Sequence, residues 1–153
     1  MDAEKIKLFM SEIPQFDKLS YEEREVLSRH MDFREVPPGE MLVREGAFGD
    51  SLFYILSGKI EIERENVKGH QAVLARFGKG STVGEMSLIN DRLARSATAR
   101  VIEDTELLIL TKQSFDRIVL EYPRIAIKIL QNIASSLSDR LRHTSGRFAD
   151  ILD

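Results

Sequence analysis

The sequence predicts a mainly β fold, an antiparallel sandwich or jelly roll, with short helices before it and a long helix after it. Residues 32–111 consist of short segments rich in Val, Ile, Leu and Phe that glycines separate, which is typical of antiparallel strands. Residues 1–31 and 113–153 carry apolar residues at helical spacing instead. The chain of 153 residues, 42% hydrophobic and 31% charged, is long enough to bury its own core, so we expect one domain over residues 1–153.

Two short helices are expected at the N-terminal end. In the first helix, the apolar residues lie at helical spacing. Pro14 is expected to end this helix, because proline has no backbone N–H to donate. Ser20 begins the second helix, since Ser20 and Glu23 have the spacing of a capping box. This helix is expected to run to about His30.

Seven strands are expected in the middle of the chain. Ile60 and Ile62 alternate with acidic residues, which is the period of a strand with one buried face. Residues 67–69, Val-Lys-Gly, predict a hairpin turn. The expected strands are Arg34–Val36, Met41–Val43, Ser51–Leu56, Lys59–Arg64, Gln71–Phe77, Thr98–Ile102 and Leu107–Leu110.

The last part of the chain predicts a short helix, Ser114–Glu121, and a long one from Pro123 to about residue 152. Proline suits the first turn of a helix because its φ is fixed at a helical value. The long helix carries an apolar seam with the 4-3-4-3-4-3 spacing of a coiled coil: Leu130, Ala134, Leu137, Leu141, Thr144, Phe148 and Ile151. We therefore expect a parallel homodimer through helix 123–152. The alternative is a helix that packs only on its own sandwich.

The composition excludes several classes of protein. The net charge of −3 makes nucleic-acid binding by the whole surface a poor expectation. The absence of cysteine removes disulfides and thiolate metal sites, and the three histidines are far apart in the sequence, so we expect no metal. No apolar run approaches the roughly 20 residues of a membrane span, and the N-terminus does not resemble a signal peptide. We expect a cytoplasmic protein.

The stretch Phe77–Ala99 carries the chemistry. Gly84 allows a close backbone approach to a ligand, and the turn that follows it has free amides for an anion. Glu85 can accept a hydrogen bond from a sugar hydroxyl. Arg95, beside the small residue Ser96, can bind a phosphate through two hydrogen bonds. Together they predict a phosphorylated sugar as ligand, whereas a surface ion pair between Glu85 and Arg95 is the alternative.

Three ordered blocks resemble cyclic nucleotide-binding domains. GEMSLINDRLARSATA, residues 84–99, resembles the phosphate-binding cassette of that family, although Ala94 stands where many members have proline. Residues 37–62 resemble the family's strand region. Residues 140–145 are similar to the end of the long dimer helix in the catabolite-activator branch, where a Thr-Ser pair meets the adenine.

The resemblance implies an eight-stranded β-roll and roles for the cassette. Glu85 would accept a hydrogen bond from the ribose 2′-hydroxyl, and Arg95 would pair with the cyclic phosphate. Backbone amides near Met86 and Ser96, together with the Ser96 hydroxyl and the open turn at Gly84, would complete the anion cradle.

The resemblance also implies roles outside the cassette. Ile62 and Leu74 would line the purine pocket, unless they are plain core residues. Thr144 and Ser145 would recognise the adenine edge. Arg140, on the long helix, would hold the Glu85 side chain in position, unless it is only a solvated charge on that helix. Cyclic AMP is the expected ligand, with cyclic GMP as a further possibility.

We expect a stand-alone binding module, not an enzyme, which signals through its long helix to an unknown downstream protein. Only nine residues follow Thr144, too few for a helix-turn-helix, so this chain alone is not expected to bind nucleic acid. The alternatives are a degenerate β-roll that serves as a scaffold without a nucleotide, and the sensory part of a transcription regulator. A metal enzyme of the cupin type needs clustered histidines, which the chain lacks.

Overall fold

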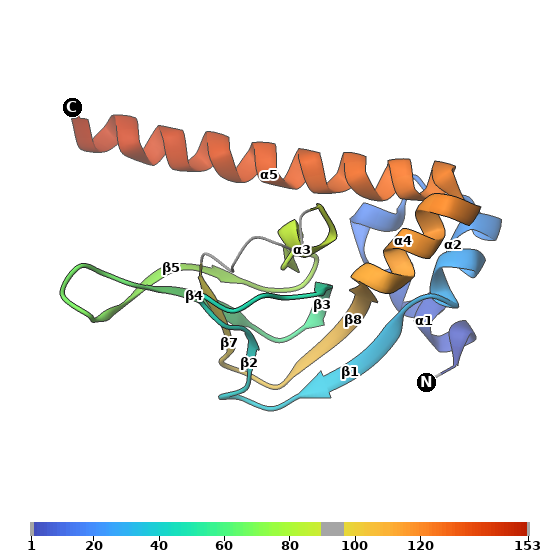
Figure 1. Cartoon of the computed structure of the whole chain (residues 1–153), viewed down its shortest axis with the longest axis horizontal. Coiled ribbons are helices and arrows are strands. Elements are labelled where there is room, and N and C mark those ends of the chain that lie inside the picture. Colours follow the sequence, from blue (N-terminus) through green and yellow to red (C-terminus); the bar gives the residue numbers. More distant parts are fainter. Residues whose placement is uncertain (1, 90–96, 153) are drawn as a thin grey trace.

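The computed structural model describes residues 2–89 and 97–152, and shows a β-roll with helices on one side (Figure 1). The described helices are α1 (Ala3–Met10), the 3₁₀ turn η1 (Pro14–Phe16), α2 (Tyr21–Ser28), α3 (Met86–Ile89), α4 (Lys112–Glu121) and α5 (Pro123–Leu152). The strands are β1 (Asp32–Val36), β2 (Met41–Val43), β3 (Ser51–Ser57), β4 (Ile60–Glu65), β5 (Gln71–Phe77), β6 (Thr82–Val83), β7 (Thr98–Val101) and β8 (Thr105–Thr111).

The strands form two four-stranded antiparallel sheets, in the orders β1-β8-β3-β6 and β2-β7-β4-β5. This confirms the predicted eight-stranded antiparallel β-roll with short N-terminal helices and a long C-terminal helix. Strand β3 explains how the layers stack, because it is buried on both faces. Phe53 and Ile55 join the core inside the roll, whereas Leu52, Tyr54 and Leu56 join the core between the sheet and the helices.

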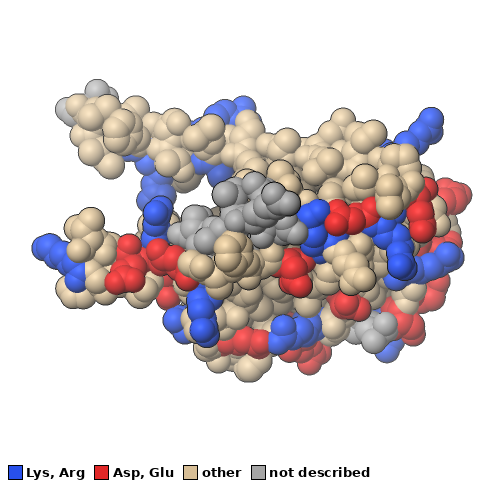
Figure 2. All heavy atoms as spheres, viewed as in Figure 1, with Lys and Arg blue, Asp and Glu red and all other residues tan. Residues whose placement is uncertain are grey.

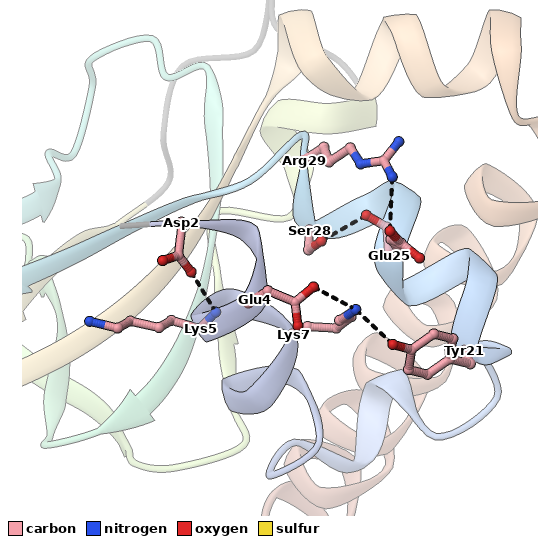
Figure 3. A network of polar contacts seen from close by, with 8 residues as sticks. All are labelled: Asp2, Glu4, Lys5, Lys7, Tyr21, Glu25, Ser28 and Arg29. Carbon is pink, nitrogen blue, oxygen red and sulfur yellow. Dashed lines mark hydrogen bonds and ion pairs between the residues drawn. The ribbon is translucent and has the colours of Figure 1, made fainter.

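The N-terminal helices pack on this second core and contact each other through polar side chains. Figure 3 shows Lys7 of α1 between the carboxylate of Glu4 and the hydroxyl of Tyr21, at 3.1 Å from each. The predicted capping box of α2 is present, since Ser20 and Glu23 exchange hydrogen bonds. Pro14 was expected to end the first helix, but α1 already ends at Met10. Pro14 instead begins η1, because its fixed φ suits a first helical turn.

Several element ends differ from the sequence expectation by one or two residues, and one strand was missed. The two-residue strand β6 was not predicted, because two residues show no alternation of burial. Helix α4 begins at Lys112 rather than at residue 114, since the Thr111 side chain caps it by accepting a hydrogen bond from the Ser114 amide at 3.1 Å.

Helix α5 runs from Pro123 to Leu152 along one side of the roll and past α3 (Figure 1). Its first half packs on its own domain through Ile125, Ile129 and Ile133, all buried. The heptad seam lies on another face. Apart from Leu137, which contacts the core, its members are exposed, and every residue of α5 from Leu141 to Leu152 is exposed. Within the described ranges, no helix combines the length and apolar character needed to cross a membrane.

Candidate functional site

The candidate site is a cavity of about 490 Å³ beside α3, and its lining includes the first residues of the segment that resembles the phosphate-binding cassette. Gly84 joins β6 to the turn before α3 with φ of +84°, a backbone conformation that side chains other than glycine rarely adopt. Apolar side chains from the five strands β2, β4, β5, β6 and β7 form most of the wall. The lining residues are Val43, Ile62, Ala75, Phe77, Val83, Gly84, Glu85, Met86, Ser87, Ala97, Thr98, Ala99 and Arg140.

The centre of the polar lining is an ion pair between Glu85 and Arg140. The Nη1 atom of Arg140 donates a hydrogen bond to Oε1 of Glu85. Its Nη2 atom donates to the backbone carbonyl of Thr82 at 2.5 Å, and the guanidinium lies 4.5 Å from the centre of the Phe77 ring. Arg140 therefore joins α5 to β5, to β6 and to the turn before α3, by one contact each.

One oxygen of Glu85 remains available. The residue is only 5% exposed, and among the described residues its Oε2 atom has no hydrogen-bond partner. Burial raises the pKa of the nearby Tyr54, and the negative charge of Glu85 raises it further. A buried carboxylate with a free acceptor suits a ligand that brings a hydroxyl donor.

The structure brings some of the predicted site residues together. Ile62, Gly84, Glu85, Met86 and Arg140 all line the cavity. What each of them does with a ligand stays a prediction at this point.

Other predicted residues lie elsewhere. Leu74 is half exposed, sits where the β4–β5 register shifts, and is not among the described lining residues. Thr144 and Ser145 are exposed on α5, just beyond Arg140, and do not line the cavity in this single chain. Arg95 and Ser96 lie outside the described residues.

A comparison with known protein families identifies the domain. Residues 33–122 match the family model described as "Cyclic nucleotide-binding domain". The chain belongs to the cyclic nucleotide-binding domain family. The resemblance expected from the sequence is therefore confirmed.

Relatives of this cyclic nucleotide-binding domain include the "Cyclic AMP receptor protein" of Thermus thermophilus, which is 35% identical over 129 residues. That match covers 84% of this chain and 57% of the receptor protein, so the chain spans little more than half of that relative. A crystal structure of a cyclic nucleotide-binding domain from Methylobacillus flagellatus KT has a TM-score of 0.84 and 26% identity, covering 97% of this chain and 83% of that one.

The crystal structure of the Thermus thermophilus Catabolite Activator Protein has a TM-score of 0.74 and 33% identity, covering 91% of this chain and 62% of that chain. These similarities show a cyclic nucleotide-binding domain of the regulatory kind. They do not extend to the remaining length of the relatives.

Several residues that line the cavity were missed by the sequence analysis. Phe77 and Ala75 are two residues apart on β5, so the strand period could have placed them on one face. Ser87 carried a weaker signal, a polar residue between Met86 and Leu88. Val43 and Ala99 carried none, because only the pairing of β2 with β7 brings them here.

Two further features of the surface bear on the site. A second hollow, of about 700 Å³, lies between η1, the turn before β6 and α5, and none of the predicted ligand-binding residues lines it. Among the residues that the structure describes, no group of three or more His, Asp or Glu residues is arranged to hold a metal ion.

Proposed function

We propose that this chain is a regulatory module that binds cyclic AMP and reports its presence through α5. The observation that carries the proposal is the buried carboxylate of Glu85, a residue of the cavity wall: its Oε2 atom has no partner among the described residues, while Arg140 of α5 holds Oε1. A ribose hydroxyl is the donor that such an acceptor needs. Because the same carboxylate contacts α5, a ligand at Glu85 acts directly on the contact that places the helix.

The remaining ligand contacts follow from family membership and stay proposals. Glu85 would accept the 2′-hydroxyl, Arg95 would pair with the cyclic phosphate, and the Ser96 hydroxyl and amides near Gly84 and Met86 would complete the anion site. The purine would lie against Ile62, with Leu74 nearby. Thr144 and Ser145 would recognise the adenine edge. The similarity to the cyclic AMP receptor protein of Thermus thermophilus supports cyclic AMP over cyclic GMP.

We propose a homodimer through α5 as the form that signals. The seam residues Leu141, Phe148 and Ile151 are 67%, 61% and 79% exposed in the single chain, so they are available to a second helix. In Figure 2, most of the visible surface of α5 is tan, and open space separates its C-terminal end from the β4–β5 hairpin. A downstream protein would sense the helix, and the chain itself would catalyse no reaction. A cytoplasmic location remains a prediction.

Calorimetric titration with cyclic AMP, cyclic GMP and a cyclic dinucleotide tests the proposal. We expect saturable binding of one molecule of cyclic AMP per chain, and weaker binding of the other two. At a ligand concentration of 100 times Kd, the domain should gain about 2.7 kcal/mol of stability against unfolding. If no cyclic nucleotide binds and none raises the melting temperature, the β-roll is a scaffold and the proposal is wrong.

A further inference from the structure

Two hydroxyls close to the cavity are buried without a hydrogen-bond partner among the described residues: Thr82 Oγ1 and Ser87 Oγ. The two residues are 4% and 3% exposed. An unpaired buried hydroxyl destabilises a folded chain, because it gives up its hydrogen bonds to water and receives nothing in return. The two differ in one respect: Ser87 lines the cavity, and Thr82 is not among the described lining residues.

Among the described residues that line the cavity, Ser87 is also the one whose hydroxyl makes no hydrogen bond. The other lining hydroxyl, Thr98 Oγ1, accepts a hydrogen bond from the Glu45 amide at 3.0 Å. The lining guanidinium of Arg140 is engaged by Glu85 and by the Thr82 carbonyl. Ser87 therefore supplies an uncommitted donor two residues after the uncommitted acceptor, Oε2 of Glu85.

A donor and an anionic acceptor in one cavity select a ligand with the opposite pair of groups. In a nucleoside 3′,5′-cyclic phosphate, the free 2′-hydroxyl and the cyclic phosphate are attached to neighbouring ribose carbons. A ligand that donates its 2′-hydroxyl to Glu85 thus presents phosphate oxygens next to that contact. The Glu85 carboxylate repels these oxygens, whereas a serine hydroxyl can donate to them.

We infer that the Ser87 hydroxyl donates a hydrogen bond to a phosphate oxygen of the bound cyclic nucleotide and thereby sets much of the affinity for it. This inference rests on the proposed function, and adds to it a ligand contact made by a side chain. A serine side chain has one rotatable bond before its hydroxyl, so directing the donor at the ligand loses little conformational entropy. The contact also explains why an unpaired hydroxyl is kept at this position of the free chain.

Two matched substitutions test the inference, Ser87→Ala and Thr82→Val. Each removes one buried hydroxyl that has no partner among the described residues, and only Ser87 is a residue that lines the cavity. Without ligand, both variants should melt at the temperature of the wild type or above it. In calorimetric titration with cyclic AMP, Ser87→Ala should bind about tenfold to a hundredfold more weakly, the effect of losing a hydrogen bond to a charged group. Thr82→Val should bind within about twofold of the wild type.

The outcomes separate this inference from the proposed function. If the wild type binds cyclic AMP and Ser87→Ala binds it equally well, the serine contact is wrong and the proposed function stands. If the wild type binds no cyclic nucleotide, both fail. A titration with 2′-deoxy cyclic AMP identifies the ligand group: the penalty of Ser87→Ala should persist with this ligand. Disappearance of the penalty would assign the hydroxyl to the ribose and overturn the phosphate contact.

Discussion

Arg140 donates a hydrogen bond to the carboxylate of Glu85, 55 residues earlier in the chain. The side chain of Glu85 is 6% exposed and that of Arg140 31% exposed, so water only partly screens the pair. The contact links the acidic residue of the cassette to the helix that carries the apolar seam. In the proposed function, ligand binding and the placement of α5 would therefore depend on the same two side chains.

Replacing Arg140 by alanine should destabilise the domain, because it leaves the Glu85 carboxylate buried and unpaired. We expect a loss of about 2–3 kcal/mol in the free energy of unfolding, measured by urea denaturation, with partial recovery in Arg140→Lys. Arg142→Ala is the matched control: Arg142 pairs with Asp139 on the same helix, but their side chains are 75% and 66% exposed. It should cost less than about 0.5 kcal/mol. Equal losses in the two variants would contradict a structural role for the buried pair.

Replacing Glu85 by glutamine should abolish discrimination between cyclic AMP and 2′-deoxy cyclic AMP. In the wild type, we expect cyclic AMP to bind about tenfold more tightly or better, since its 2′-hydroxyl donates to a charged acceptor. In Glu85→Gln, the two affinities should nearly coincide. The control is Glu63→Gln. Glu63 is also buried, at 8% exposure, and its Oε1 atom lies 3.3 Å from Nε of Arg100. Glu63 is not among the described residues that line the cavity. Discrimination that survives in Glu85→Gln would remove Glu85 from the ribose site.

Replacing Leu141 or Phe148 by glutamate should split the proposed homodimer without unfolding the chain. Both side chains are more than half exposed in the single chain, so a charge there costs little folding stability. Light scattering after size exclusion should give about twice the 17.5 kDa chain mass for the wild type, and the chain mass for the variants. Arg142→Glu, also on α5, changes a charge outside the seam and should remain dimeric. A monomeric wild type at high concentration would exclude the dimer.

Replacing Gly58 by alanine should be far more harmful than replacing Gly39, although both have φ of +96°. A Cβ at Gly58 would lie 2.5 Å from the Asp104 carbonyl oxygen and 2.6 Å from the Thr105 Cα, whereas a Cβ at Gly39 has nothing within 4 Å. We expect Gly39→Ala to lose about 1–2 kcal/mol from left-handed strain alone, and Gly58→Ala at least about 3 kcal/mol. Thermal unfolding of the two variants gives the comparison. Similar melting temperatures would show that the backbone of the β3–β4 turn shifts to accommodate the added Cβ.

The interaction of Glu23 with Lys128 should make stability depend on pH. A hydrogen bond from the Lys128 ammonium, followed by one from the Ser20 amide, holds the pKa of Glu23 below its ordinary 4.5. The stabilisation is therefore complete above about pH 4.5, and is lost as the pH falls through the lowered pKa. The difference in unfolding free energy between wild type and Glu23→Gln should shrink as the pH drops from 6 to 3. The matched control is Glu22→Gln, which removes an exposed carboxylate from the same turn and leaves the contact between Glu23 and Lys128 in place.

The fold could be predicted because its local patterns and its packing agree. In β3, alternate residues enter different cores, and in α2 the capping box is complete within four residues. The strand β6 could not be predicted, since its two residues are fixed by pairing with Phe53 and Tyr54 rather than by a pattern of their own.

The site could be predicted only in part, for a similar reason. Glu85 and Gly84 stand in one short segment, so their chemistry is visible in sequence, whereas the place of Phe77 under Arg140 depends on how α5 packs. Helix α5 has two apolar faces, and sequence periodicity alone singled out the seam. The face built on Ile125, Ile129 and Ile133 turned out to be the one that the domain uses.

Helix α5 extends well beyond its contact with Glu85 at Arg140. The helix continues for twelve residues beyond Arg140 to Leu152, roughly 18 Å at 1.5 Å per residue, and all of them are exposed. With Arg140 as the pivot, a tilt of about 10° would sweep the tip through about 3 Å, more than half the height of one helical turn. A displacement of α5 that begins at the Glu85–Arg140 contact would therefore be largest at the exposed end of the helix.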